Sequence, residues 1–233
     1  MPLTLAADTS TPVNSVALCQ DDQVLAATQV QCDRLHSERL IDTVDWVLNQ
    51  ARHTLNDVEL FTIATGPGSF TGLRIGAATW KGLAFAIRRP LVAVPTLDAL
   101  ARLAPTTDGL VVPVLDAKMK EVFAAVYEFR NGERNKILPD QVSSMDALLD
   151  VITDAPYFLG DGVAPYKDAI LERFPKARLA PPCLNLPQAV AVAYEGQQLF
   201  LQGAETDPGL LAPVYLRKSQ AELHHETKTQ ATP

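Results

Sequence analysis

A short apolar run, a glycine-rich turn and a long apolar segment follow one another in the first half of the chain, and this succession constrains the fold most. Residues 60–64 read Leu-Phe-Thr-Ile-Ala between turn residues, which predicts a buried strand. Residues 66–76 read Gly-Pro-Gly-Ser-Phe-Thr-Gly-Leu-Arg-Ile-Gly. Pro67 restrains the backbone between two permissive glycines, and Ser69 or Thr71 can cap a helix that we predict to run to about Arg88. The stretch therefore predicts a buried strand joined tightly to a helix.

The glycine-rich turn differs from two common phosphate-binding loops. No Gly-Lys-Ser or Gly-Lys-Thr follows at the Walker spacing, so the phosphate-binding lysine is missing. Thr71 stands where a dinucleotide fingerprint has its third glycine. Free N–H groups at the helix start can bind an anion, but every capped helix has them. The turn alone therefore predicts no nucleotide site.

The remaining chain reads as two similar successions of strands and helices. The first has strands at residues 3–7, 15–19 and 24–30 as an antiparallel meander, a helix at 40–51, the stretch above, a strand at 91–94 and a helix at 96–103. After a connection at 105–109, the second has strands at 110–115, 122–129 and 137–138, a helix at 145–152, a strand at 157–159 and helices ending near 174 and 201. We therefore expect an α/β chain with a first lobe at 1–105, completed by residues near 205–217, and a second, reduced lobe at 106–204. The polar residues 218–233 predict a disordered tail.

Charge and cysteine content narrow the function. The formal net charge of −7 argues against independent binding to RNA phosphates. No apolar run reaches about 18 residues, and no basic leader precedes an apolar one, so we expect a cytoplasmic protein without a membrane span. Cys19, Cys32 and Cys183 are odd in number and far apart, which fits reduced, mostly buried thiols.

Three stretches closely resemble the bacterial TsaB (YeaZ) family. They are residues 66–76, residues 7–10 (Ala-Asp-Thr-Ser) and residues 115–118 (Leu-Asp-Ala-Lys), and the resemblance extends over nearly the whole chain to about Arg217. The resemblance implies the duplicated, RNase H-like fold of actin, Hsp70 and sugar kinases, with two lobes. It also implies a subunit of the machinery that makes threonylcarbamoyladenosine in tRNA.

The same resemblance implies where a nucleotide would lie. In that superfamily it lies between the lobes, and an acidic residue near the end of each lobe's first strand helps to position metal and phosphate; Asp8 and Asp116 occupy these places. We interpret Asp8, Thr9 and Ser10 as a retained phosphate-loop-like turn, whereas Asp116 and the Gly-flanked Asp161 read as ordinary turn residues. We expect no cofactor of the chain's own, and ATP or ADP with Mg²⁺ bound weakly or not at all.

Histidine placement bears on metal chemistry. The family's catalytic relative, TsaD, binds its metal through a His-x-x-x-His pair on the helix after the last strand of the first lobe. Thr96 and Leu100 stand at those positions here, and neither can serve as such a ligand. His36 and His53 flank the first helix as surface or capping residues, and the His-His pair at 224–225 lies in the predicted tail. We therefore expect no catalytic residue and no metal site, and a peptidase is the least favoured activity.

Two functions remain open. The first is a non-catalytic partner that pairs with a TsaD-like paralogue, works with a TsaE-like ATPase, and supports threonylcarbamoyl transfer to adenosine 37 of tRNA reached only through the complex. The isolated chain can then form a homodimer. The second is a free-standing small-molecule kinase or ATPase that uses Asp8 as its metal anchor.

The helix after the glycine-rich turn is apolar over most of its circumference. One face, formed by Leu73, Ala77, Trp80, Ala84 and Ile87, is expected to pack on the sheet of its own lobe. Arg74, Lys81 and Arg88 form a polar stripe beside it. The remaining side is small and apolar, and it is expected either to pack under the first helix or to bind a partner. Its residues are Gly72, Ile75, Gly76, Thr79, Gly82, Leu83 and Ala86.

Overall fold

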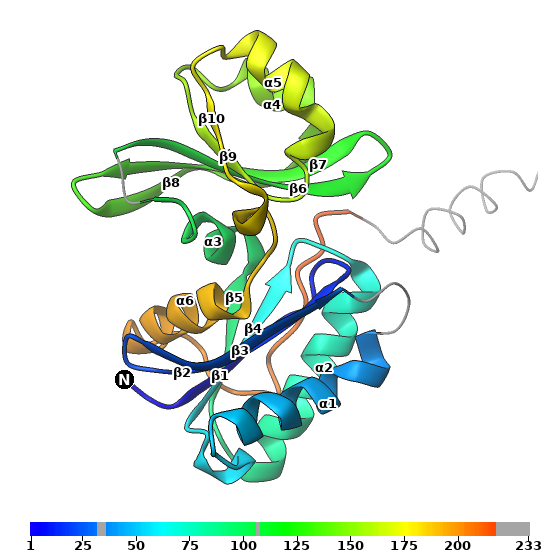
Figure 1. The fold of residues 1–233 in the computed structure, drawn as a ribbon, viewed down its shortest axis with the longest axis vertical. Helices are drawn as coiled ribbons and strands as arrows, with labels where there is room; N and C mark the ends of the chain where they lie inside the picture. Colours follow the sequence, from blue (N-terminus) through cyan, green and yellow to red (C-terminus); the bar gives the residue numbers. More distant parts are fainter. Residues whose placement is uncertain (32–35, 106–107, 218–233) are drawn as a thin grey trace, which may run out of the picture.

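The computed structural model describes residues 1–31, 36–105 and 108–217 and contains two five-stranded sheets, one in each lobe (Figure 1). The first sheet has the order β3-β2-β1-β4-β5. Its strands are β1 (Thr4–Asp8), β2 (Val13–Gln20), β3 (Gln23–Gln31), β4 (Leu60–Gly66) and β5 (Leu91–Pro95). β1 pairs antiparallel with β2 and parallel with β4, and β5 adds in parallel. The antiparallel meander and the order of strands and helices predicted from the sequence are confirmed.

The second sheet repeats this arrangement. Its order is β10-β9-β6-β7-β8, so the first strand of the unit again lies centrally between a meander and two parallel strands. Its strands are β6 (Gly109–Lys118), β7 (Glu121–Arg130), β8 (Glu133–Ser144), β9 (Tyr157–Leu159) and β10 (Arg178–Leu179). The duplicated α/β fold is therefore confirmed.

The helices differ in length between the lobes. The first lobe has α1 (His36–Gln50), α2 (Phe70–Ile87) and α3 (Thr96–Ala101). The second unit has α4 (Met145–Asp150), α5 (Lys167–Arg173) and α6 (Ala189–Leu201), with the 3₁₀ turns Ala164–Tyr166 and Pro182–Leu184; a third such turn, Leu55–Asp57, lies in the first unit. The helices α4 and α5, at 6 and 7 residues, are much shorter than α1 and α2, at 15 and 18. The second unit is therefore reduced in α4 and α5 and also in its parallel strands β9 and β10, which have 3 and 2 residues against 7 and 5 in β4 and β5.

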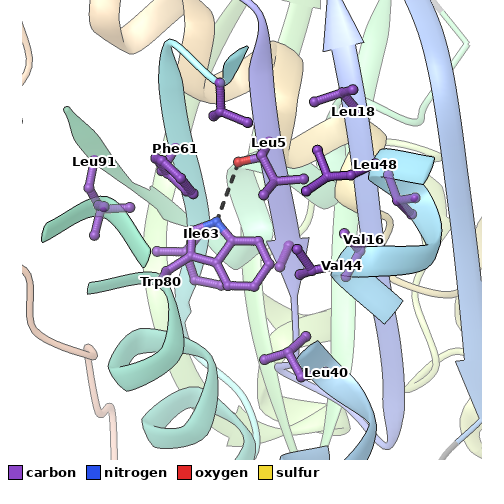
Figure 2. Close-up of a cluster of buried hydrophobic side chains, with 14 of the residues drawn as sticks. Leu5, Val16, Leu18, Leu40, Val44, Leu48, Phe61, Ile63, Trp80 and Leu91 are labelled. Carbon is purple, nitrogen blue, oxygen red and sulfur yellow. Dashed lines mark hydrogen bonds between the residues drawn. The ribbon is translucent and has the colours of Figure 1, made fainter. Parts of the chain in front are cut away.

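The core of the first lobe lies between its sheet and the pair α1 and α2 (Figure 2). Trp80 is fully buried at its centre, and its indole N–H donates to the carbonyl oxygen of Leu5 at 3.4 Å. Leu40 and Val44 of α1 pack against the same strands. The apolar face predicted for α2, with Trp80 in its middle, is confirmed as the sheet-facing side. This packing fixes the axis of α2 relative to β1 and β4.

Helices α3 and α6 pack on the sheets of the opposite units. Leu97 and Leu100 of α3 join the core of the second sheet, although α3 follows the first sheet in sequence. Val192 and Ala193 of α6 pack with Ala6 of the first sheet, although α6 follows the second. The expectation that residues 106–204 all belong to the second lobe is therefore wrong for α6, because its apolar face fits the uncovered side of the first sheet.

A buried ion-pair network joins the lobes beside these helices. Glu195 of α6, only 4% exposed, accepts from Arg102 at 2.8 Å and from Arg134 of β8 at 2.6 Å. Arg134 also donates to the backbone carbonyl oxygen of Asp98 at 2.8 Å. Because α6, β8 and the segment around α3 meet at one carboxylate, this side of the interface holds both lobes firmly.

Several sequence-based expectations concern the cysteines, the tail and membrane association. Cys19 is buried as expected, whereas Cys183 is exposed, contrary to a buried thiol. Cys32, the histidines at 224–225 and the tail at 218–233 lie outside the described residues. Within residues 1–31, 36–105 and 108–217, no helix is long and apolar enough to cross a membrane.

Candidate functional site

A cleft of about 530 Å³ opens between the two lobes. The first lobe contributes Ser10 and the turn before α2, and the second contributes the end of β6 and Asp161. Residues 214–217, near the end of the described chain, form part of the same wall. The cleft therefore lies between the lobes, as the resemblance to actin-like proteins implied, and at least five separate segments line it.

Asp8 lies behind the cleft wall and is 1% exposed. Its Oδ1 accepts from the backbone N–H of Ser10 at 2.8 Å and from the Ser10 hydroxyl at 2.7 Å, while Oδ2 has no hydrogen-bond partner. Burial raises the pKa of Asp8 to about 6 against the Ser10 hydrogen bonds, and the negative charge of Asp161 adds to this rise. The unpaired Oδ2 of Asp8 could accept a hydrogen bond or bind a cation.

Thr9 and Ser10 hold α2 in place. The Thr9 hydroxyl donates to the carbonyl oxygen of Gly72 at 2.8 Å, and the Ser69 N–H donates to the carbonyl oxygen of Ser10 at 2.6 Å. Ser69 also caps α2 by accepting from the N–H of Gly72. Of the three residues predicted to bind a phosphate, Ser10 lines the cleft, whereas Asp8 and Thr9 do not. Most polar groups of Asp8, Thr9 and Ser10 form hydrogen bonds within the lobe.

Gly72 and Gly76 were predicted to contact a partner, whereas the structure places both against residues of their own lobe. Both are buried against Thr9 of their own lobe. A Cβ at Gly72 would lie 2.0 Å from the Thr9 carbonyl oxygen, and one at Gly76 would lie 2.3 Å from the Thr9 Oγ1. Any side chain larger than glycine would therefore push α2 away from the end of β1. The small side of the helix serves close packing at this end.

The wall from the second lobe carries a compact set of charges. Asp116 accepts from the backbone N–H of Lys118 at 2.8 Å and pairs with its ammonium group at 2.6 Å. Partial burial opposes ionisation of Asp116, but its bonds to Lys118 outweigh this effect and lower its pKa. Asp161 accepts from the Asp116 N–H at 3.0 Å, and burial raises the pKa of Asp161. Asp161 thus fixes the end of β6, a role beyond the plain turn that was expected.

A cluster of planar side chains at the mouth of the cleft was not predicted. The guanidinium carbon of Arg74 lies 3.8 Å from the centre of the Phe70 ring, and Phe70 contacts Tyr215 at 4.4 Å between ring centres. Arg74 also donates to the Tyr215 hydroxyl at 3.1 Å. Tyr215 follows Arg74 by 141 positions, so no local spacing signalled this contact.

Thr96 and Leu100, which the resemblance placed at the metal-ligand positions, both have structural contacts here. Thr96 is fully buried, and its hydroxyl accepts from the N–H of Gly66 at 3.1 Å. Leu100 packs in the core of the second sheet. His53, on the other side of the lobe, lies 3.8 Å from Asp57. Among the described residues, no three His, Cys, Asp or Glu side chains cluster as metal ligands would.

Helices α1 and α2 lie side by side (Figure 1). Both helices carry large apolar side chains that are exposed to solvent. Ile41 and Trp46 of α1 are 44% and 49% exposed, and Phe85 of α2 is 55% exposed. We call these three, with the exposed Gly82 and Ala86 and the half-buried Ile75, Thr79 and Leu83, the α1–α2 face. Ile75 and Leu83 also pack against the core of the first lobe, as the intramolecular interpretation predicted for them.

Two lobes that repeat one strand order, with a cleft between them, define a protein of the duplicated actin-like class. Component A of (R)-2-hydroxyglutaryl-CoA dehydratase from Acidaminococcus fermentans shares this fold at 12% identity and a TM-score of 0.53, covering 85% of this chain and 99% of its own.

Closer relatives identify the family. A Bacillus subtilis protein described as tRNA threonylcarbamoyladenosine biosynthesis protein TsaB is 31% identical over 222 residues, which cover 94% of this chain and 95% of that protein. YeaZ from Pseudomonas aeruginosa is 29% identical with a TM-score of 0.77, covering 93% of this chain and all of the solved one. The family model "TsaD: tRNA N6-adenosine threonylcarbamoyltransferase" matches residues 28–225. The chain belongs to the TsaB family within this group of tRNA-modifying proteins.

Proposed function

We propose that this chain is the non-catalytic partner subunit of the cytoplasmic machinery that makes threonylcarbamoyladenosine in tRNA. In this role it pairs with a TsaD-like paralogue and supports threonylcarbamoyl transfer to adenosine 37. The observation that carries the proposal is the exposed α1–α2 face on a chain of the TsaB family. The formal net charge of −7 supports contact with tRNA through the complex rather than directly. A TsaE-like ATPase would be the third component.

The α1–α2 face has the composition of an interface. Trp46 and Phe85 are aromatic residues about half in solvent, and exposed aromatic side chains of this size are typical anchors of protein interfaces. Gly82 has no neighbouring heavy atom within 4 Å of a built Cβ, so a partner helix can approach the backbone there. The same face can join two copies of the chain when the partner is absent.

The alternative, a free-standing kinase or ATPase, has less support. The Thr9 hydroxyl is bonded to Gly72 and the Ser10 hydroxyl to Asp8, so neither is left to bind a phosphate without rearrangement. We propose that ATP or ADP with Mg²⁺ binds the isolated chain weakly or not at all. Calorimetry decides this point, because tight binding that Asp8→Ala abolishes would favour the kinase.

The partner proposal is tested with Thr79→Arg, which places a charge within the α1–α2 face. We expect this variant to bind the co-expressed TsaD-like paralogue roughly 30-fold or more weakly while the isolated chain keeps its thermal midpoint. Thr153→Arg, at an exposed threonine of the second lobe, is the matched control and should bind normally. Normal affinity of Thr79→Arg would place the interface elsewhere, and a collapsed midpoint would show that the site is internal.

A further inference from the structure

The last described segment of the chain returns to the first lobe and runs along it toward the second. We call residues 205–217 the C-terminal strap (Figure 1, orange). The N–H of Leu91 in β5 donates to the carbonyl oxygen of Thr206 at 3.0 Å. The N–H of Val214 donates to the carbonyl oxygen of Thr65 in β4 at 2.7 Å. The strap therefore continues the hydrogen bonding of the first sheet at two points eight residues apart in the sequence.

Two residues of the polar stripe of α2 form hydrogen bonds with this strap. The ammonium group of Lys81 donates to the carbonyl oxygens of Gly209 and Leu211 at 3.3 and 3.1 Å. Arg74, one stripe position earlier, bonds to the hydroxyl of Tyr215. Leu211 is 8% exposed and packs in the core of the first lobe. The lower part of the strap is thus anchored through backbone carbonyls and one buried side chain.

Gly66 allows the strap to approach the turn before α2. Its φ is +122°, and a Cβ built there would lie 2.3 Å from the carbonyl oxygen of Val214. A residue other than glycine would meet both the strained backbone angle and the strap. The glycine-rich turn therefore accommodates the C-terminal segment as well as the start of α2.

The upper end of the strap contacts the second lobe. Leu216 packs against the core of the second sheet. Arg217 pairs with Glu121 at the start of β7 at 2.9 Å, and its guanidinium also lies 3.8 Å from the sulfur of Met119. Lys118, Met119 and Lys120, in the hairpin between β6 and β7, all have left-handed backbone angles. The strap ends on a hairpin of unusual conformation at the edge of the cleft.

We propose that the C-terminal strap is a latch that holds the two lobes together across the cleft. It bonds to β4 and α2 at one end and to the β6–β7 hairpin at the other, and residues 214–217 between them line the cleft. The buried network at Glu195 joins the lobes on another side and acts as the fixed hinge. Release of the latch opens the cleft and frees Arg74 and Phe70 at its mouth.

The latch is weaker than the hinge. Tyr215 is 39% exposed and the pair of Arg217 with Glu121 is solvent-accessible, whereas Glu195 is 4% exposed. Exposed ion pairs contribute little to stability, and segments with few buried contacts open first. Because α2 carries both the strap and the α1–α2 face, opening of the latch also loosens the start of α2. The latch thereby couples the cleft to that face through one helix.

Amide hydrogen exchange of the full chain tests the latch. In the double variant Tyr215→Ala/Arg217→Ala, we expect exchange in the hairpin at 116–121 and in the turn and helix start at 68–74 to rise roughly tenfold. Exchange in β1 and β4 should stay unchanged. Leu210→Ala, at a strap residue 66% exposed, is the matched control and should leave every segment unchanged.

Each outcome of this experiment decides the proposal. Faster exchange confined to the two named segments supports the latch. Unchanged hairpin exchange overturns it, because the strap would then not restrain the second lobe. A uniform rise that includes β1 and β4 also overturns it, because the strap would then be part of the folding core. Small-angle scattering adds a second readout, since an opened cleft increases the radius of gyration of the double variant but not of Leu210→Ala.

Discussion

Replacing Gly72 by alanine tests whether the small side of α2 packs inside its own lobe. The new Cβ would lie 2.0 Å from the carbonyl oxygen of Thr9, so α2 and the end of β1 must separate by about 1 Å or more to restore ordinary contact. Neither side moves freely, because Ser69 and Ser10 are joined by a 2.6 Å hydrogen bond and Trp80 anchors the helix below. Gly72→Ala is therefore expected to strain the junction between helix and strand.

The loss of folding stability expected for Gly72→Ala is the sum of three contributions. Overpacking of this kind costs about 1–3 kcal/mol, and loss of the bond from the Thr9 hydroxyl to Gly72 costs about 1 kcal/mol more. The higher helix propensity of alanine returns about 1 kcal/mol. The net loss of about 1–3 kcal/mol corresponds to a fall in thermal midpoint of roughly 3–10 °C for a chain of this size.

Gly82→Ala is the matched control, because it lies in the same helix with nothing within 4 Å of its built Cβ. It should keep the helix-propensity gain without a clash and raise the midpoint by up to about 4 °C. Circular dichroism or calorimetric melts of both variants make the comparison. A Gly72→Ala midpoint equal to or above that of the unmodified chain would refute the close contact with Thr9.

Three further predictions concern buried or reactive groups. The folded-state pKa of Asp8 is raised to about 6 from 3.8, so protonated Asp8 stabilises the folded chain fully below pH 3.8 and this stabilisation is lost as the pH rises through 6. Between pH 4 and 8, the free energy of unfolding of Asp8→Asn should therefore rise by up to about 3 kcal/mol relative to that of the unmodified chain. Urea unfolding at several pH values measures this difference. Glu195→Ala should lower the free energy of unfolding by about 3–5 kcal/mol in the same assay, because it leaves two arginines without their shared carboxylate; a loss below about 1 kcal/mol would contradict the hinge. In a Cys32→Ser background, a thiol reagent should modify the exposed Cys183 within minutes and Cys19 only on unfolding, since burial raises the pKa of Cys19 to about 12; fast modification of Cys19 in the folded chain would contradict its burial.

The strands and the main helices could be predicted from the sequence because their signals are local. Alternation and apolar runs located the strands, and the helical period identified Trp80 as facing the sheet. The packing of α6 could not be predicted, because its apolar face suits either sheet and only the three-dimensional arrangement selects the first. The helical wheel likewise showed that Gly72 lies on a small side of α2, but not that Thr9 occupies that side.

The position of the cleft was predicted from the sequence, but the contacts of the residues around it were predicted only in part. Strand order and the resemblance located the cleft at the end of the first strand of each lobe, with Asp8 and Asp116 near it. The hydroxyl of Thr9 was expected to serve a phosphate, yet it donates to Gly72. Tyr215 was missed because a contact across 141 positions leaves no periodic trace in the sequence. Long-range contacts shape the wall of the cleft, and they leave no local signal in the sequence.

The packing of α6 on the first sheet has a consequence for synthesis of the chain. The last strand of that sheet ends at Pro95, whereas α6 ends at Leu201, roughly 100 residues later. At about 5–20 residues per second, the ribosome needs about 5–20 s to supply the missing helix. During this interval the face of the sheet that includes Ala6 and Val94 is covered only in part, by Ala99 of α3, because the side chains of α6 are missing. We therefore expect the nascent first lobe to expose apolar surface on this side of its sheet until α6 has been synthesised.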